Sequence, residues 1–391
     1  ILGERDYPAG VPQRLEDNAS HALPMQMGVA FSQIDEPFEA SLEKLTSIPY
    51  PNVTTPSSTY IVLDAQVNAS YAVAIALLDE DADVYRSTEN IEKDAVKVPA
   101  GSFIIRNTPQ IQNDLSDLLE KWHVTAHGLD DIDNIAKIEL RMPRIGLYQS
   151  FTRNGNMDEG WTRFVFDDFG IPYTTLHNAD MRGNLGKKFD VIVFANEDPA
   201  IIKTGLPSPD YYGRRFGAFP PKYSGGVGEK GIEALASFVG QGGILVALDN
   251  AGTLFAKEFD LPVKNVLNGL SESEFFVPTS LLKIKVDNQS QIGYGMPAEA
   301  AAMFFRSVAY STRLPSSGDW DRRVIASYPE SNILLRGWTL GEGQLTRRAA
   351  VVDAGYKKGR VILIGFRSQH RAQTHGTYKF LFNSVLYSKL N

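Results

Sequence analysis

The second half of the chain alternates short, fully apolar runs with amphipathic stretches. Apolar runs at 189–194, 243–248 and 361–366 are typical of parallel strands that are buried on both faces. A shorter run begins at Ile145 and leads into an amphipathic stretch, which Asn156 can cap and Gly170 can end. Because strands and helices alternate, we expect an α/β domain with a parallel sheet over this half of the chain.

Residues 58–140 repeat this alternation on a smaller scale. Strand-like runs near 60–63, 83–86 and 102–106 are separated by helical patterns at 69–78 and 111–122. The alternation predicts a small α/β domain in which right-handed crossovers join parallel strands.

Two further segments have weaker patterns. Prolines interrupt residues 1–57 throughout, so we expect a connector without regular elements. Its apolar residues would hold it against the domains: Leu23, Met25, Met27, Val29 and Phe31. Residues 253–345 also lack a clear pattern, apart from a strand at Leu281–Val286 and a helix over Ala298–Phe305.

Composition narrows the possible functions. The chain has 391 residues, a net charge of −7 and no cysteine. The charge argues against nucleic-acid binding, and no apolar run reaches membrane-spanning length. Without cysteine there is no disulfide, thiolate nucleophile or cysteine-bound metal. The histidines form no His-x-x-Glu or His-Glu-x-x-His motif, so we expect no metal and no cofactor in this chain.

Polar side chains follow the predicted parallel strands, at the edge where such sheets place their ligand sites. A ligand-binding crevice can be built from these residues: Tyr148, Gln149, Glu197, Asp249, Asn250, Arg367, His370 and Arg371. The alternative is that arginine and carboxylate side chains pair there and only stabilise the fold. A loop at 205–226, rich in aromatic residues, could cover the crevice or pack in the core.

Catalysis at this edge lacks a nucleophile. Asp249 could orient His370 as a general base. However, no serine or cysteine follows the strand at 243–248, where the nucleophile of an acyl-transfer enzyme would stand. A hydrolase that uses Asp249, Glu197 and His370 stays open as an alternative, as does a purely structural module.

Long motifs in a fixed order carry a resemblance to a known group of proteins. They are DYPAGVPQRLEDNASHALPMQMGV, RIGLYQSF, MDEGWTRFVFDDFG, YSGGVGEKGIEALASFVGQGGILVALD, YGMPAEAAAMFF and KGRVILIGFRSQHRAQTHGTYKFLFN. Together they resemble the C-terminal region of bacterial secreted zinc carboxypeptidase-like proteins of the carboxypeptidase A-like superfamily. The resemblance implies a flavodoxin-like, class I glutamine amidotransferase-like domain that follows a zinc peptidase domain.

The departures from that group are informative. The peptidase domain has no counterpart in these residues, so the resemblance places zinc outside this chain. Active amidotransferase relatives carry a cysteine nucleophile, and here its position falls near Asn250 in a chain that has no cysteine. The resemblance therefore implies a domain without glutaminase activity, and no catalytic residue is assigned.

These observations lead to one expectation. Because the chain begins at Ile1, we expect a C-terminal fragment or processed form of a periplasmic or secreted protein. It would comprise a connector (1–57), a small α/β domain (58–140) and an amidotransferase-like domain (141–391). Its expected role is accessory: packing on the peptidase domain of its own parent protein, or binding a peptide or cell-wall ligand in the crevice.

Overall fold

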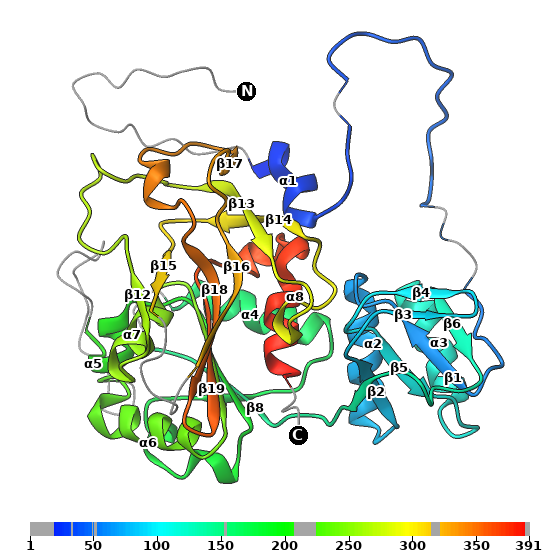
Figure 1. Cartoon of the computed structure of the whole chain (residues 1–391), viewed down its shortest axis with the longest axis horizontal. Helices are drawn as coiled ribbons and strands as arrows, with labels where there is room; N and C mark the ends of the chain where they lie inside the picture. Colours follow the sequence, from blue (N-terminus) through cyan, green and yellow to red (C-terminus); the bar gives the residue numbers. More distant parts are fainter. Residues whose placement is uncertain are drawn as a thin grey trace.

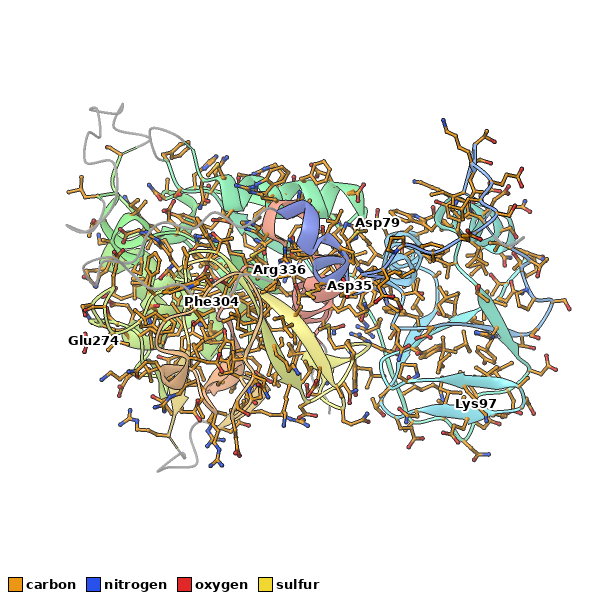
Figure 2. All side chains as sticks on the ribbon, turned by 90° about the horizontal axis from the view of Figure 1, so that it is seen from above. Asp35, Asp79, Lys97, Glu274, Phe304 and Arg336 are labelled. Carbon is orange, nitrogen blue, oxygen red and sulfur yellow. The ribbon has the colours of Figure 1, made fainter. Side chains whose placement is uncertain are left out.

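A large sheet of 12 strands dominates the molecule. The computed structural model describes residues 19–32, 34–48, 50, 53–151, 155–206, 224–313 and 321–387, and the side chains from residue 22 on. Within them the chain forms a 12-stranded sheet, a 5-stranded sheet and a 2-stranded hairpin (Figure 1). Figure 2 shows the molecule from above. Phe304 marks the part that contains the 12-stranded sheet, and Lys97 marks the part that contains the 5-stranded sheet. Most of the loop expected at 205–226 lies outside the described residues.

Half of the large sheet is parallel, as the apolar runs predicted. Its strands are β8 (Ile145–Tyr148), β9 (Thr174–Leu176), β10 (Val191–Phe194), β11 (Ile244–Leu248) and β19 (Gly359–Ile364). They lie in the order β9-β8-β10-β11-β19, and each neighbouring pair is parallel. Numbered along the chain, this is the order 2-1-3-4-5 of flavodoxin-like sheets. The predicted α/β fold class is confirmed.

Helices cover both faces of these parallel strands. They are α4 (Met157–Asp168), α5 (Pro199–Thr204), α6 (Gly228–Gly240), α7 (Ala251–Glu258) and α8 (Tyr378–Val385). Val191 and Val193 of β10 pack in one hydrophobic cluster with α4 and α8. Ile192 and Phe194 pack in the other, with α5, α6 and α7. Successive side chains of a strand point to opposite faces, which explains why the strand is apolar at every position.

The other half of the large sheet is antiparallel, where the sequence pattern indicated mostly irregular chain. Its strands are β12 (Val263–Asn265), β13 (Ser280–Val286), β14 (Glu299–Phe304), β15 (Tyr310–Thr312), β16 (Arg322–Ser327), β17 (Leu334–Arg336) and β18 (Ala349–Tyr356). The helix predicted over Ala298–Phe305 is wrong, because this segment is β14 and pairs with β13 from Ser280↔Phe304 to Lys285↔Glu299. Tertiary pairing here overrides the helix propensity of the alanines.

The small sheet is built from two interleaved β-α-β units. Its elements are β1 (Tyr60–Leu63), α2 (Asn68–Asp79), β2 (Val84–Ser87), β5 (Phe103–Arg106), α3 (Gln112–Trp122), β6 (Ala126–Leu129) and β7 (Lys137–Glu139). The hairpin of β3 (Ile91–Lys93) and β4 (Val96–Val98) lies between β2 and β5 in the chain. In the order β6-β1-β5-β2-β7 every neighbouring pair is antiparallel.

The strands that the predicted crossovers join are parallel, but they are not neighbours in this small sheet. β1 and β2 do run in the same direction, but β5 inserts between them, and β1 in turn separates β5 from β6. This is the split β-α-β arrangement of ferredoxin-like folds. Periodicity identified the strands, but it cannot tell which strands become neighbours.

The connector contains a helix that its prolines concealed. Helix α1 (Ala19–Met27) has Pro24 inside it. Ala22 is buried against Leu281 and Met303 of the large sheet, and these tertiary contacts offset the amide donor that proline lacks. Of the five residues expected to hold the connector, only Met25 packs against this cluster; the other four are exposed.

Polar contacts join the two sheets through α8. The Arg86 guanidinium of β2 donates to Asn383 of α8 and to the hydroxyl of Tyr71. One turn earlier on α8, Lys379 Nζ donates to Asn68 Oδ1 at 2.7 Å. Arg86 and Asn383 are almost completely buried, so these bonds form away from solvent.

Among the described helices, none has the length and apolar character needed to cross a membrane.

Candidate functional site

Side chains from four elements meet at the carboxyl edge of the parallel strands. Arg367, which follows β19, places Nε 3.2 Å from Asp158 Oδ2 and 3.4 Å from Asp249 Oδ2. Asn196, which follows β10, donates to Asp158 Oδ2 at 2.9 Å and accepts from the Asn250 amide at 3.2 Å. The structure thus brings together Asp249, Asn250 and Arg367 of the expected crevice, with Asp158 and Asn196 between them.

Asp249 occupies the sharp turn between β11 and α7. Its φ of 53° is left-handed, and its side chain is completely buried. The Ser307 hydroxyl donates to Asp249 Oδ2 at 2.9 Å. Burial raises the pKa of Asp249 to about 7, although Arg367 and Ser307 act in the opposite direction. The residue with the left-handed backbone at this turn is therefore Asp249, which directly precedes Asn250.

Glu197 and Tyr148 have separate partners. The Ser150 hydroxyl donates to Glu197 Oε2 at 2.6 Å, and the Asp198 amide donates to Oε1 at 2.9 Å. Burial raises the pKa of Glu197, and these hydrogen bonds oppose the shift. The Tyr148 hydroxyl donates to Asn178 Oδ1 at 2.6 Å. Both side chains are buried and hydrogen-bonded inside the protein, which leaves them little freedom to reach a ligand.

Gln149 points towards α4. Its Nε2 lies 3.4 Å from Glu159 Oε2, and Glu159 also pairs with Arg163 one turn along the helix. Glu159 is buried, and burial raises its pKa against the opposing effect of Arg163.

Phe305 lies beside both His370 and Arg367. His370 lies in the short 3-10 turn η7 (His370–Ala372), and its ring centroid is 6.1 Å from that of Phe305. The Arg367 guanidinium carbon lies 4.4 Å from the Phe305 centroid, a cation–π distance. Burial, followed by the charges of Arg367 and Arg371, lowers the pKa of His370 to about 4. His370 is therefore neutral at pH 7, while Arg371 is exposed beside it.

The His370 ring also contains an unsatisfied polar atom. His370 Nδ1 is buried and has no hydrogen-bond partner among the described residues. Such atoms are rare in folded proteins because the lost hydration is not replaced. Asp249 contacts Ser307 and Arg367, so the part of the chain described here contains no hydrogen bond between Asp249 and His370. The expected base and its orienting acid are thus not paired with each other.

Sequence reasoning did not anticipate Ser307 or Phe305 in this site. Both residues lie between β14 and β15, far along the chain from the strand ends that they contact. No local pattern marks them, because the antiparallel half of the sheet alone brings this connection to the crevice. Within the described ranges, no group of His, Asp and Glu side chains is arranged to hold a metal ion.

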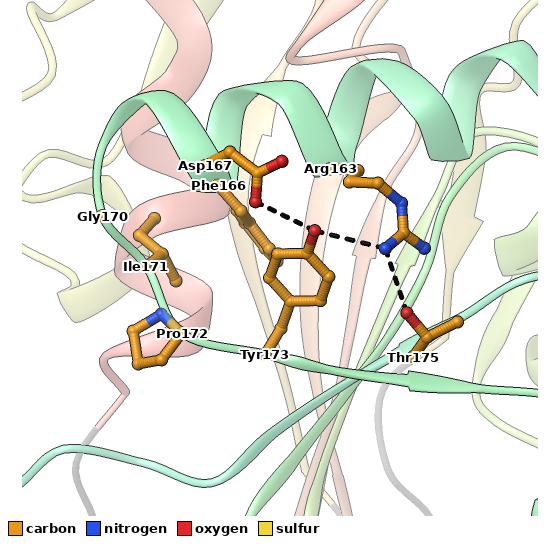
Figure 3. Close-up of a pocket in the computed structure, with 8 residues that line it drawn as sticks. All are labelled: Arg163, Phe166, Asp167, Gly170, Ile171, Pro172, Tyr173 and Thr175. Carbon is orange, nitrogen blue, oxygen red and sulfur yellow. Dashed lines mark hydrogen bonds between the residues drawn. The ribbon is translucent and has the colours of Figure 1, made fainter.

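A separate groove of about 580 Å³ lies between α4 and β9, at the edge of the sheet. Figure 3 shows Tyr173 at its centre: the hydroxyl donates to Asp167 Oδ1 at 2.9 Å and accepts from Arg163 Nη1 at 3.2 Å. Arg163 Nη1 also donates to Thr175 Oγ1 at 3.0 Å. None of the residues expected to form the crevice lines this groove.

Comparisons with known proteins give a likeness in structure only. No protein-family model and no curated protein sequence matches the chain. A ThuA-like protein from Bacteroides uniformis has 12% identity and a TM-score of 0.36, over 62% of this chain and 89% of that one. A GMP synthase-type protein from Thermoplasma acidophilum has 11% identity and a TM-score of 0.33, over 63% of this chain and 96% of that one.

A much longer protein is similar over part of its length. The β-galactosidase Gan42B has 10% identity and a TM-score of 0.35, and the match covers 71% of this chain but 34% of the enzyme. Likenesses at this level carry no information about activity, so function has to be argued from the side chains of this chain.

Proposed function

We propose that the carboxyl edge of the parallel strands binds a polar ligand, a peptide or a cell-wall glycan, without catalysing a reaction on it. The observation that carries the proposal is the state of Asp249. This residue stands at the turn where hydrolases of related topology carry their nucleophile, but its carboxylate is completely buried and held by Ser307 and Arg367. A carboxylate held in this way cannot reach a substrate.

Three side chains close to Arg367 support binding. His370 Nδ1 is buried and has no hydrogen-bond partner among the described residues, so a turn of the ring that presented it to a ligand would remove the cost of leaving it unsatisfied. Phe305 is 37% exposed and offers an apolar face beside it. Arg371 is exposed and can pair with a carboxylate. Such a mixture of one aromatic face and a few polar groups suits peptides and sugars.

Equilibrium titration of the full chain with short peptides and with cell-wall glycan fragments tests the proposal. We expect His370→Ala and Phe305→Ala each to weaken binding about tenfold, since each removes one contact worth about 1.4 kcal/mol. Phe164→Ala is the matched control, because Phe164 is 52% exposed on α4 and lies outside the crevice. Variants at His370 and Phe305 that bind as tightly as the parent would exclude this site.

We also infer, from the motifs quoted above, that the chain belongs to a longer secreted or periplasmic protein with an N-terminal zinc peptidase domain. The inference rests on that resemblance alone. This chain would then be an accessory region that packs on the peptidase domain of the same protein. The coding sequence upstream of Ile1 tests this: a His-x-x-Glu zinc motif there is expected, and an unrelated sequence would end the proposal.

Two other functions each have one observation in their favour. The raised pKa values of Asp249 and Glu197 are typical of general acids and bases, which favours a hydrolase. A hydrolase screen should then give activity that Asp249→Asn removes.

The mutual pairing of Arg367, Asp158 and Asp249 instead favours a structural module. Titration of the chain with peptides and glycans would then detect no binding.

A further inference from the structure

The chain between α1 and β1 is anchored at both ends but uncovered in the middle. At one end α1 packs on the large sheet. At the other, the Tyr50 ring stacks on His123 at 3.6 Å, and Thr55 Oγ1 lies 2.8 Å from Ser116 Oγ. The described residues from 29 to 48 are all exposed and belong to no helix or strand. Figure 1 shows them as a dark-blue arch that rises away from both sheets.

The composition of this arch is not that of a linker. Flexible linkers are rich in glycine, serine or charged residues and poor in large apolar ones. Here the exposed apolar side chains are Phe31 (53%), Ile34 (64%), Phe38 (61%), Leu42 (83%), Leu45 (69%) and Ile48 (69%). Exposed apolar side chains at this density indicate an interaction surface.

The apolar residues recur with a helical period. They are three or four positions apart, and at 100° per residue all six fall within an arc of about 120°. Pro37 suits the first turn of a helix, and Asp35 and Glu36 suit its positive end. Pro49 would end it. The interpretation of residues 1–57 as a segment without a pattern rested on the prolines and overlooked this stripe.

A helix that begins at Pro37 and ends before Pro49 needs a partner. Isolated helices shorter than about 12–15 residues are marginal in water, so the extended form is expected for the free chain. Burial of the stripe in a groove would supply the missing stabilisation, as in other segments that fold when they bind.

Charge identifies the kind of partner. Between residues 34 and 48 the chain carries Asp35, Glu36, Glu39 and Glu43 but only one basic residue, Lys44. All of them lie outside the apolar arc. An acidic face is repelled by anionic lipid and by a second copy of itself, whereas it complements lysine and arginine side chains. We propose that residues 37–48 fold into an amphipathic helix that binds a partner protein with an apolar groove edged by lysine and arginine.

Site-specific photo-crosslinking in cells that make the protein can find this partner. A crosslinking amino acid at Leu42 lies on the apolar stripe, and one at Ala40 lies on the opposite face of the same helix. We expect Leu42 to give one protein adduct, and Ala40 to give far less of it. The crosslinked peptide of the partner should map to an apolar groove with basic residues at its edges.

Titration of the purified partner with the full chain then tests the mode of binding. Leu42→Asp should weaken binding about 30-fold, which corresponds to about 2 kcal/mol of lost apolar burial. Glu43→Pro and Glu43→Gln form a matched pair, because both remove the charge but only proline breaks a helix. We expect Glu43→Pro to bind at least about tenfold more weakly than Glu43→Gln.

Several results would overturn the proposal. They include equal crosslinking from both faces, no protein adduct, and equal binding by the two Glu43 variants. Flotation with vesicles of phosphatidylcholine and phosphatidylglycerol that Leu42→Asp abolishes would assign the stripe to a membrane instead. A dimer in sedimentation velocity that the same variant dissociates would assign it to a second copy.

Discussion

At the scale of single residues, Asp249 combines features that are rarely found together. Its backbone is left-handed, its side chain is completely buried, and its carboxylate contacts both a hydroxyl and a guanidinium. A left-handed conformation is strained for a residue other than glycine and persists only where surrounding contacts enforce it. Here Ser307 and Arg367 provide those contacts, so the turn and the ion pair depend on each other.

The first prediction concerns the proton on Asp249. Burial raises its pKa to about 7, whereas in the unfolded chain it is about 4. The folded protein therefore holds a proton that the unfolded chain releases. The stability that this group contributes is fully present below about pH 4 and is lost as the pH rises towards 7. Asp249→Asn does not titrate, so its stability relative to the parent should increase over this range, by on the order of 4 kcal/mol.

Urea unfolding of both proteins at about pH 4, 5.5 and 7.5 measures this difference. Glu197 has a raised pKa too, but it is present in both proteins and cancels in the comparison. A difference between the two proteins that stays constant with pH would show that the Asp249 carboxyl is not perturbed.

At the scale of elements, α4 shows what local sequence can and cannot establish. The predicted cap is confirmed: Asn156 Oδ1 accepts from the amides of Asp158 and Glu159 at 3.0 and 3.1 Å. The amphipathic pattern of this helix is less regular in the fold, because Phe164 is 52% exposed while Glu159 and Thr162 are buried. Glu159 is tolerated in the interior because Arg163 and Gln149 bond to it, and these partners are visible only in the fold.

The second prediction tests this cap. Asn156→Ala removes the acceptor for two amides at the start of α4 and should lower the free energy of unfolding by about 1 kcal/mol. Asn156→Ser keeps an acceptor of similar capping strength and should recover most of this loss. Urea denaturation of the three proteins gives the comparison. Equal midpoints for the alanine and serine variants would mean that the effect does not arise from capping.

At the scale of the whole molecule, buried polar residues join the two sheets. Asn383 accepts from Tyr71 of α2 and from Arg86 of β2, and it donates to the Tyr294 carbonyl at 2.8 Å. Burial lowers the pKa of Lys379, one turn away on α8, to about 8. The contact between the sheets thus contains two buried cations, Arg86 and Lys379, whose hydrogen-bond partners are largely neutral groups.

The third prediction concerns this junction. Asn383→Ala leaves the Arg86 guanidinium buried with one hydrogen bond fewer and should lower the free energy of unfolding by about 1.5–3 kcal/mol. Gln241→Ala is the control, because its amide also bonds a side chain, Ser237, but at an exposed position. We expect the control to change stability by less than about 0.5 kcal/mol. Calorimetric scans that show the same melting temperature for both variants would contradict a stabilising role for the junction.

Features that depend on neighbours in the chain were predictable from the sequence pattern. Runs that are apolar at every position identified the buried strands β10, β11 and β19, and Asn156 as a candidate cap located the start of α4. The pattern also placed Asp249 and Arg367 at one edge of the parallel sheet, because the carboxyl ends of parallel strands share an edge. These inferences need only the periods of a strand and a helix.

Which distant segments meet could be seen only in the fold. It inserted β5 between β1 and β2, made β14 a strand, and brought Ser307 to Asp249 across 58 positions of the chain. It also showed that Asp249 occupies the strained turn. Strand order and buried ion pairs depend on the free energy of contacts between distant segments, and local periodicity does not encode them. This is why the sequence proposed a crevice, whereas the structure shows its central carboxylates already paired.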